Sequence, residues 1–305
     1  MPGRSATAPR RSCLTVPGSS ERMLAKAASL RADMVILDLE DAVAPSEKER
    51  ARGVVTEAVR SLQWGRRVVG VRVNDWTSPW TVADVQAVVA GSAGRLDVVV
   101  LPKVEDAGMV RALDLVLAQA EQAAGLPPGD IGIDAQIESA AGVQELRSIC
   151  SSSARLEAIA LGPLDLAASL GMPADTAQGR RRFDSIASAM VVAARAAGIR
   201  ALDGPWVDIR DLDGLAADAR WAAELGFDGK WVLHPDQVAA VDEAFTPSAD
   251  ALARAERILA AYESATEQAG RGAVLVDGEM IDEASCRIAR ALVARGRQAD
   301  QEEDG

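Results

Sequence analysis

The feature that most constrains the fold of this chain is a regular alternation of short apolar runs with helix-forming segments. Eight of the runs are rich in Val, Ile, Leu and Ala, which is typical of strands buried in a parallel sheet. Eight strands separated by helices indicate an α/β fold, a (β/α)8 TIM barrel, more than an open sheet. The predicted strands are residues 12–16, 33–37, 67–73, 96–101, 131–137, 158–161, 199–202 and 229–233.

The barrel is expected to occupy residues 12–246 of the 305-residue chain. Residues 1–11 carry three arginines but no apolar stretch, so we interpret them as a flexible leader and not as a secretory signal. Residues 247–305 hold an Ala-rich helix, a hairpin with its turn at Asp277-Gly278, and a last helix. A barrel closes without these residues, so they are predicted to form a C-terminal extension.

The net charge limits the partners that the protein can bind. At −12, with a pI near 4.7, the chain lacks the basic field that nucleic acids require. No apolar run approaches the length of a membrane span, so we expect no membrane partner. The three cysteines have no metal-ligand spacing and indicate no disulfide framework, which is typical of the reducing cytoplasm.

Nearly every predicted strand ends in a polar or conformationally special residue. Barrel enzymes build their active sites from residues at the carboxyl ends of the strands. One such residue would have a simple structural explanation, but eight in succession indicate a functional site. These residues are Pro17 with Gly18, Asp38 with Glu40 and Asp41, Arg72 with Asn74, Lys103, Glu138, Asp165, Asp203 and His234.

Two of these carboxylates form a candidate metal site. Glu138 follows the fifth strand and Asp165 follows the sixth, so both are expected at the same end of the barrel. Carboxylate oxygens with waters and substrate oxygens are the ligands that Mg²⁺ prefers. Each acid also has a structural alternative, because Glu138 could interact with a helix dipole and Asp165 could cap a helix.

Arg72 is the second candidate, because an unpaired charge inside an apolar strand is costly. It is expected either to face the barrel mouth or to pair with Asp38 or Glu40. Its guanidinium fork suits a small carboxylate bound bidentately.

Each of the remaining candidates has a possible structural role beside the functional one. Lys103 is either a salt-bridge partner or a ligand for an anionic group. The only histidine, His234, is expected to stabilise the turn at the proline that follows it. Taken alone, Asp282 is an N-cap or a first-turn acid of the last helix.

Seven motifs follow one another along the predicted strands. They are Leu14-Thr-Val-Pro-Gly18, Val35-Ile-Leu-Asp-Leu-Glu-Asp-Ala-Val43, Val71-Arg-Val-Asn74, Leu101-Pro-Lys103, Ile137-Glu138, Leu161-Gly-Pro-Leu-Asp-Leu166 and Lys230-Trp-Val-Leu-His-Pro235. With these motifs in this order, the chain resembles the citrate lyase beta-subunit-like family, which includes malyl-CoA and citramalyl-CoA lyases. The resemblance covers roughly residues 12–290 and therefore nearly the whole chain.

The resemblance implies a Mg²⁺-dependent enzyme that assembles as a homotrimer or homohexamer. It implies that Glu138 and Asp165 bind the metal and that Arg72 binds the carboxylate end of a 2-keto acid. It also implies that Asp282, supplied by a neighbouring subunit, takes part in proton transfer. Glu40 joins Asp282 and Arg72 as a catalytic candidate.

The implied reaction is the reversible Claisen-type cleavage of a 3-hydroxyacyl-CoA to an acyl-CoA and a small 2-keto acid. Malyl-CoA, methylmalyl-CoA and citramalyl-CoA are the expected esters, and glyoxylate or pyruvate is the expected acid. The same site could hydrolyse the thioester if water reaches it. The predicted substrate contacts are Gly162, Pro163, Leu164 and Lys103 around the acid, and Arg22, Lys26 and Arg10 at the phosphates of coenzyme A.

Two alternatives stay open at this point. The chain could be a citrate lyase beta subunit that acts on an acyl-carrier protein thioester, which would require a partner surface. It could also be a CoA-independent hydroxy-keto-acid aldolase. That enzyme class is expected to carry a histidine base on an early loop, and no histidine precedes His234 here.

Overall fold

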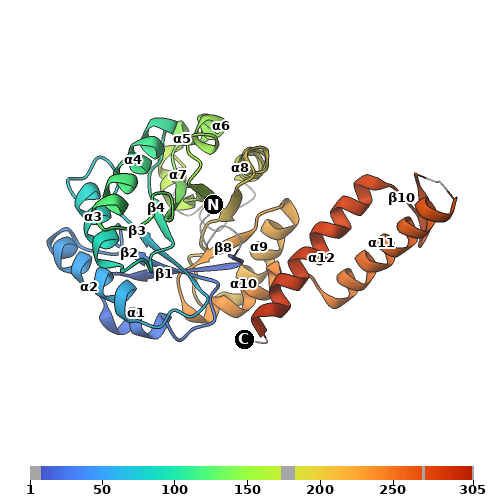
Figure 1. Cartoon of the computed structure of the whole chain (residues 1–305), viewed down its shortest axis with the longest axis horizontal. Coiled ribbons are helices and arrows are strands. Elements are labelled where there is room, and N and C mark those ends of the chain that lie inside the picture. The colour runs from blue at the N-terminus through green and yellow to red at the C-terminus, as the bar shows by residue number, and fades with distance from the viewer. Residues whose placement is uncertain (1–7, 173–182, 270–271, 304–305) are drawn as a thin grey trace. The chain divides into compact units, whose positions relative to one another are not determined.

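The computed structural model describes residues 8–172, 183–269 and 272–303 (Figure 1). The chain divides into two compact units, Met1–Asp242 and Glu243–Gly305. This division lies four residues before the predicted boundary between barrel and extension. Among the described residues, no helix has both the length and the apolar character that crossing a membrane requires.

The first unit is a closed barrel of eight parallel strands, which confirms the predicted fold. Each strand pairs with the next along the chain, and β1 pairs with β8 to close the sheet. The strands are β1 (Ser12–Pro17), β2 (Met34–Asp38), β3 (Val68–Arg72), β4 (Val98–Leu101), β5 (Gly132–Ile137), β6 (Leu156–Leu161), β7 (Arg200–Asp203) and β8 (Gly229–Val232).

Helices follow the strands and surround the barrel, as Figure 1 shows. Several begin where the sequence supplies a side chain that accepts the first free backbone N–H groups; Asp106, for example, accepts from Gly108 and Met109. The helices are α1 (Glu21–Ala27), α2 (Lys48–Ser61), α3 (Thr81–Gly91), α4 (Ala107–Ala123), α5 (Ala140–Gln144), α6 (Leu146–Cys150), α7 (Pro163–Ser169), α8 (Asp184–Ala197), α9 (Leu212–Leu225) and α10 (Val238–Phe245), with 3-10 turns η2 (Pro45–Glu47) and η5 (Pro235–Gln237).

The barrel interior is filled by alternate residues of the strands, because successive side chains of a strand point to opposite faces. Small side chains on some strands leave room for large ones on others, so the interior is a packed core and not a channel. Its buried apolar members are Cys13, Met34, Ile36, Val68, Val98, Val100, Ala158, Ala160, Leu202 and Trp231.

The amino-terminal end of the barrel is closed by a buried ion-pair group that we call the floor cluster: Arg10, Asp134 and Glu157. Arg10 is 1% exposed; its Nη1 donates to both carboxylate oxygens of Asp134 at 2.8 Å, and its Nη2 pairs with Glu157. A Cβ at Gly229 would overlap the Arg10 carbonyl oxygen, so the chain approaches β8 closely here.

The floor cluster corrects two expectations about the amino-terminal segment. A leader through residue 11 is wrong at its end, because Arg10 is buried and Arg11 donates to Asp33 at 2.8 Å. The expectation that Arg10 contacts phosphates of coenzyme A is also wrong, since its guanidinium is committed to two acids inside the barrel. Residues 1–7 of the predicted leader lie outside the described residues.

The second unit has a small core of its own. It consists of α11 (Ala249–Ala269), a hairpin of β9 (Val274–Val276) and β10 (Glu279–Ile281), and α12 (Glu283–Glu303). The hairpin turn is at Asp277 and Gly278, as predicted, and both have positive φ angles (52° and 84°), as a type I′ turn requires. The core residues are Ala255, Ile258, Ile281, Cys286, Ala289 and Val293.

Candidate active site

Arg72, the last residue of β3, is the buried cation at the carboxyl end of the barrel. Its Nε and Nη2 donate to the two oxygens of Asp38, each at 2.7 Å, and its Nη1 lies 2.9 Å from Glu40 Oε2. Nη1 also donates to Gln136 Oε1 at 3.4 Å. Burial alone would lower the pKa of the guanidinium, but Asp38 and Glu40 more than offset it, so the pKa of Arg72 is raised.

These contacts decide between the two expectations for Arg72, because the side chain both faces the site and pairs with Asp38 and Glu40. Arginine has five N–H donors, and three of those in Arg72 make hydrogen bonds to protein oxygens, two to Asp38 and one to Gln136. Nη1 also forms an ion pair with Glu40 Oε2, which has no hydrogen-bond partner among the described residues. Asp38 occupies the Nε–Nη2 edge of the guanidinium, so a substrate carboxylate cannot bind bidentately at that edge while Asp38 holds it.

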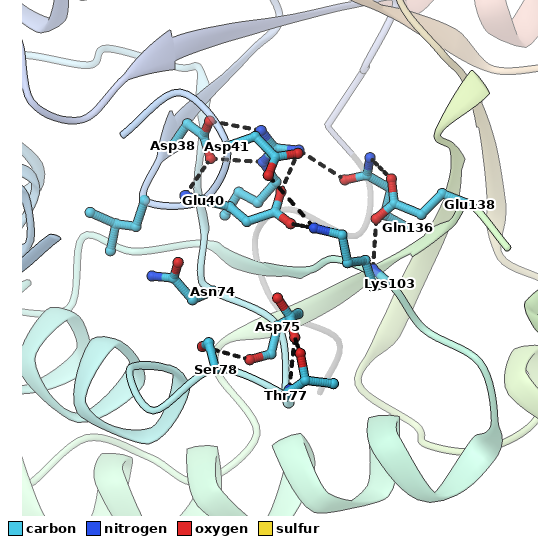
Figure 2. Close-up of polar contacts among 12 residues, drawn as sticks. Asp38, Glu40, Asp41, Asn74, Asp75, Thr77, Ser78, Lys103, Gln136 and Glu138 are labelled. Atoms are coloured by element: carbon cyan, nitrogen blue, oxygen red, sulfur yellow. Dashed lines mark hydrogen bonds and ion pairs between the residues drawn. The ribbon is translucent and has the colours of Figure 1, made fainter. Parts of the chain in front are cut away.

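Asp38 is a site residue that the sequence interpretation underrated as a mere partner. Besides holding Arg72, its carboxylate accepts the backbone N–H groups of Glu40 (2.8 Å) and Ala42 (3.1 Å). One buried acid therefore fixes both the guanidinium and the loop that carries Glu40 (Figure 2). The sequence shows Asp38 as an acid at the end of an apolar strand, but it does not show which groups Asp38 bonds to.

Lys103 connects two acids of the site through different atoms. Its backbone N–H donates to Glu138 Oε1 at 2.7 Å, while its Nζ donates to Glu40 Oε1 and lies 3.6 Å from Asp41 Oδ1 (Figure 2). Its φ angle is +52°, a left-handed conformation that is uncommon outside glycine and costs about 1 kcal/mol. Desolvation opposes its charge, but the bond to Glu40 and the nearby acids raise the pKa of Lys103. Lys103 is thus a salt-bridge partner that also orients Glu138.

Glu138 is 3% exposed and is held at both oxygens. Oε1 accepts from the Lys103 backbone, and Oε2 accepts from Gln136 Nε2 at 2.6 Å. Burial, then the charges of Glu40 and Asp165, raise the pKa of Glu138 to about 8. A carboxylate in these surroundings is short of positive charge.

Gly162 makes the room that Glu138 occupies. A Cβ at this position would overlap Glu138 Oε2 and would lie 2.5 Å from the Glu138 Cβ and 2.9 Å from Gln136 Nε2. Any side chain at residue 162 would therefore displace the acid. This contact places Gly162 beside the candidate metal ligand, and its contact with substrate stays a prediction.

Asp165 lies in the first turn of α7 and is half-buried. The alternative that it caps this helix is wrong, because Gly162 is the N-cap and no side chain bonds there. The charge of Asp165 contributes to the raised pKa of Glu138, which shows that the two carboxylates are close enough to interact. The helix-dipole alternative for Glu138 is not supported either, since Ser139 caps α5.

The chemistry of this donor set fits a divalent cation. Five acids (Asp38, Glu40, Asp41, Glu138, Asp165) are offset by three cations, Arg72, Lys103 and the buried Lys48, whose Nζ donates to the carbonyl oxygens of Leu39 and Glu40. No group of three or more His, Cys, Asp or Glu side chains arranged to hold a metal occurs within the described residues. The fitting site is therefore a pair of carboxylates, Glu138 and Asp165, whose remaining ligands come from water or substrate.

Comparison with known proteins identifies the family. Residues 11–235 match the family described as HpcH/HpaI aldolase/citrate lyase. The chain belongs to this family. An L-malyl-CoA/beta-methylmalyl-CoA lyase of Cereibacter sphaeroides is 38% identical over 307 residues, covering 96% of this chain and 95% of the relative. The resemblance inferred from the motifs is confirmed.

Two other members of the HpcH/HpaI aldolase/citrate lyase family add to this comparison. A (3S)-malyl-CoA thioesterase of C. sphaeroides is 37% identical over 292 residues, covering 94% of each chain. The solved structure of CitE from Mycobacterium tuberculosis in complex with magnesium, acetoacetate and coenzyme A has a TM-score of 0.77 and 32% identity. It covers 96% of this chain and 99% of that one. Named relatives of nearly equal similarity thus include a lyase and a thioesterase.

One predicted strand-end residue, Asp203, has a structural role and does not face the mouth of the barrel. Asp203 is buried and accepts from Lys230 Nζ at 2.6 Å, and Lys230 also bonds to Asp218 (2.6 Å) and to the Gly204 carbonyl (2.7 Å). Trp231 points into the barrel, so its neighbour Lys230 points outward toward α9. This cluster ties β7 and β8 to α9.

His234 has the structural role predicted for it. Its Nδ1 accepts the Asp236 backbone N–H at 3.3 Å and caps the turn Pro235–Gln237. Asn74 donates to Asp84 through Nδ2 at 2.6 Å and thereby anchors the loop after β3 to α3. Neither side chain joins the Arg72–Glu138 group.

Four other predicted contacts of the first unit, Arg22, Lys26, Pro163 and Leu164, make no hydrogen bond or ion pair with this group among the described residues. Arg22 and Lys26 are exposed, four residues apart on α1, and so share one face of that helix. Pro163 is buried and Leu164 is exposed at the start of α7. Asp282, in the second unit, caps α12 by accepting from the Ser285 N–H at 3.0 Å, and its pKa is lowered by bonds from Ser285.

Proposed function

We propose that the protein is a Mg²⁺-dependent CoA-ester lyase that reversibly cleaves a 3-hydroxyacyl-CoA to an acyl-CoA and a small 2-keto acid. The observation that carries the proposal is the pair of the buried Glu138 and the half-buried Asp165 near Arg72 at the carboxyl end of the barrel. The named malyl-CoA relatives support malyl-CoA or beta-methylmalyl-CoA as the ester. Glyoxylate is then the keto acid, with citramalyl-CoA and pyruvate as the next pair to test.

The bond changes of this reaction define what the side chains must do. In cleavage, the hydroxyl of the ester loses its proton, the adjacent C–C bond breaks, and its electron pair moves into the thioester as an enolate. The enolate carbon then takes up a proton to give the acyl-CoA. When bound by Glu138 and Asp165, Mg²⁺ would supply Lewis-acid polarisation of the oxygen that becomes the keto group. Arg72 would donate an N–H to the acid end of the substrate.

Asp282 is the proposed acid–base residue at the enolate carbon. We place it in the site of a neighbouring subunit, within a homotrimer or homohexamer. The second unit offers an apolar hairpin face that another subunit would bury, since the paired residues Leu275 and Met280 are 72% and 70% exposed. Glu40 is proposed as a catalytic residue through its contacts with both Arg72 and Lys103.

Asp282→Asn tests this acid–base role without removing the helix cap. Asn caps helices as well as Asp does, so we expect an unchanged melting temperature and oligomeric state. Loss of general acid–base catalysis is expected to lower kcat about a hundredfold or more. Full activity of the variant, or of a stable monomer of the wild type, would remove Asp282 of a neighbouring subunit from the mechanism.

Coenzyme A is proposed to lie with its phosphates near Arg22 and Lys26. Both are exposed cations on one face of α1, and neither belongs to the buried network. All three cysteines are free and buried, which is in keeping with a cytoplasmic protein.

The thioesterase relative makes hydrolysis a specific second candidate. One experiment separates the two: acetyl-CoA or propionyl-CoA is incubated with glyoxylate or pyruvate, with and without Mg²⁺, and CoA esters and free thiol are measured together. The proposal expects a new 3-hydroxyacyl-CoA without thiol release, only with Mg²⁺. Malyl-CoA that yields free thiol but no glyoxylate would identify a thioesterase. The absence of both products with every pair would reject the CoA-ester chemistry.

A further inference from the structure

Lys48, the first residue of α2, is a buried cation that has no role in the proposed reaction so far. It is 6% exposed. Its Nζ donates to the backbone carbonyl oxygens of Leu39 at 2.8 Å and Glu40 at 2.7 Å. The ammonium also lies over the ring of Trp80, with 5.6 Å between Nζ and the ring centroid. Lys48 therefore contacts both the loop after β2 and the residue that precedes α3.

Lys48 makes no ion pair with a carboxylate among the residues that the structure describes. Lys230 is buried as well, but its Nζ lies 2.6 Å from both Asp203 and Asp218. Removing an ammonium from water without a paired acid is unfavourable. Burial accordingly lowers the pKa of Lys48, and the negative charge of Asp38 only partly opposes this shift.

The place of Lys48 on α2 is unfavourable for a cation too. The N-terminus of a helix carries a partial positive charge, so a lysine in the first turn is repelled by it. The helix follows the 3-10 turn Pro45–Glu47, and no side chain caps it. A methionine of similar volume would occupy this position without these penalties. Neither packing nor helix formation therefore explains a lysine here.

The backbone of Glu40 gives Lys48 a purpose. The Glu40 N–H donates to Asp38 at 2.8 Å, and the Glu40 carbonyl accepts from Lys48. Buried charged side chains thus hold the peptide groups on both sides of the Glu40 Cα. From this fixed backbone, the Glu40 carboxylate reaches Arg72 and Lys103. Catalytic groups need such support, since a displacement of about 1 Å can lower a rate about a hundredfold.

We propose that Lys48 is a positioning residue that holds Glu40 between Arg72 and Lys103. This assignment rests on the proposed lyase function, in which Glu40 is a catalytic residue. Lys48 acts through the backbone of Glu40 and not on the substrate, because its ammonium is buried and bonded to loop carbonyls.

The kinetic test is a double-mutant cycle of Lys48→Met and Glu40→Gln. Lys48→Met alone is expected to lower kcat about tenfold to a hundredfold and to leave KM for the acyl-CoA within about twofold of wild type. In the Glu40→Gln background, the same change is expected to lower kcat by less than about twofold, because the side chain that it positions is already inactive. A lysine with a merely structural role would lower kcat equally in both backgrounds.

Hydrogen exchange tests the position of the loop without any substrate. The backbone N–H groups of Glu40, Ala42 and Val43 are bonded within this loop or to Asp38. In Lys48→Met, exchange of these amides, measured by mass spectrometry of peptides that span residues 39–44, is expected to be at least about tenfold faster.

Lys230→Met is the matched control, because it removes a buried lysine that does not contact this loop. It leaves Asp203 and Asp218 buried without their cation, so we expect a larger fall in melting temperature than in Lys48→Met. Exchange in residues 39–44 should be unchanged, and the effects of Lys230→Met and Glu40→Gln on kcat should be additive.

Lys48→Arg is the second variant at this position and replaces Lys48→Met in both tests if that protein does not fold. It keeps the charge, but its longer planar guanidinium cannot donate to the two carbonyls from the same point. We expect a smaller loss of kcat than in Lys48→Met, and the same dependence on Glu40.

The two readouts separate this assignment from the proposed function. If the wild type makes no CoA ester, the lyase function is wrong, and hydrogen exchange alone decides whether Lys48 holds the loop. If the wild type is active but Lys48→Met leaves exchange in residues 39–44 unchanged, or lowers kcat equally with and without Glu40, the positioning role is wrong and the lyase function stands.

Discussion

Two arginines inside the same barrel, Arg10 and Arg72, show how similar ion pairs serve different ends. Each is buried and each holds an aspartate with short bonds, Asp134 at 2.8 Å and Asp38 at 2.7 Å. At the floor cluster, Arg10 pairs with Asp134 and Glu157 and closes the barrel, although its Nε has no hydrogen-bond partner among the described residues. At the carboxyl end, acids outnumber cations. The difference lies in the surplus charge around each pair and not in its geometry.

The carboxyl end of the barrel differs from the floor cluster in its excess of negative charge. A buried ion pair by itself is weak support for either stability or function, because desolvation offsets much of the attraction. The negative charges of Glu40 and Asp165 raise the free energy of ionised Glu138. A bound cation would lower it. The four predictions below test whether the floor cluster and the carboxyl end of the barrel differ in their effects on stability and activity.

The largest effect is expected from Arg10→Met, which leaves Asp134 and Glu157 buried without their cation. Breaking a buried pair in this way lowers the free energy of unfolding by about 3–5 kcal/mol. Denaturant unfolding measures this loss, and kcat of the folded fraction should stay within about twofold of wild type. A large fall in kcat with unchanged stability would give the floor cluster a catalytic role and end the contrast.

Arg72→Met is expected to lower activity as well as stability, because it also leaves Asp38 buried without the cation that it bonds to. Removing the cation that faces the substrate is expected to lower kcat/KM for the keto acid by about a hundredfold to a thousandfold. Steady-state kinetics with saturating acyl-CoA measures this effect. A variant that keeps its activity and only loses stability would make the two arginines equivalent.

The pH dependence of stability in Glu138→Gln tests whether negative charge is in excess around this acid. Because the pKa of Glu138 is raised to about 8, its ionisation in the metal-free protein opposes folding, so wild-type stability falls as pH rises from about 4 toward 8. We expect the variant to be more stable than wild type by about 2 kcal/mol at pH 8.5 in EDTA, and equal to it near pH 4. Thermal melts at both pH values measure this difference.

Mg²⁺ provides the control for this prediction. Added Mg²⁺ should raise the melting temperature of wild type at pH 8.5 and leave that of Glu138→Gln unchanged. Equal stabilisation of both proteins would mean that Glu138 is not a ligand.

The smallest effect is expected from substitution of Asp242. This acid also has a raised pKa but is not one of the candidate site residues. Burial, then Asp33, raise the pKa of Asp242 to about 7, so it too destabilises the fold as pH rises from about 4 to 7. Asp242→Asn is expected to gain about 1 kcal/mol at pH 8 and nothing at pH 4, without a change in kcat. A change in kcat would connect this acid with catalysis and weaken the contrast.

The fold was predictable because local patterns determine it. The predicted run 131–137 corresponds to β5 (Gly132–Ile137), and the run 67–73 corresponds to β3 (Val68–Arg72). Apolar composition and strand-end residues suffice for such assignments. The hairpin was likewise marked by Asp277-Gly278, whose positive φ angles the turn demands.

The site was predictable only in part, because its decisive contacts join distant residues. The partners Asp134 and Glu157 lie more than 120 residues from Arg10, so nothing near Arg10 marks it as buried. Strand periodicity placed Asp203 at a strand end. It did not reveal that Asp203 bonds to Lys230 and therefore does not face the barrel mouth. The proposed metal pair rests on topology, because Glu138 directly follows β5 and Asp165 lies in the first turn of α7 after β6, so both lie at the carboxyl end of the barrel.

Gly162 links the identities of two residues that are far apart in sequence. Since any Cβ there would overlap Glu138 Oε2, the acid after the fifth strand and the residue after the sixth are one joint choice. A chain that keeps glutamate at the first position is confined to glycine at the second. A shorter acid at the first position would not make room, because the Cβ of residue 138 itself lies 2.5 Å from where that of residue 162 would be. On this backbone, glycine at the second position is therefore a condition for any acid at the first, which narrows the sequences through which the candidate metal site can evolve.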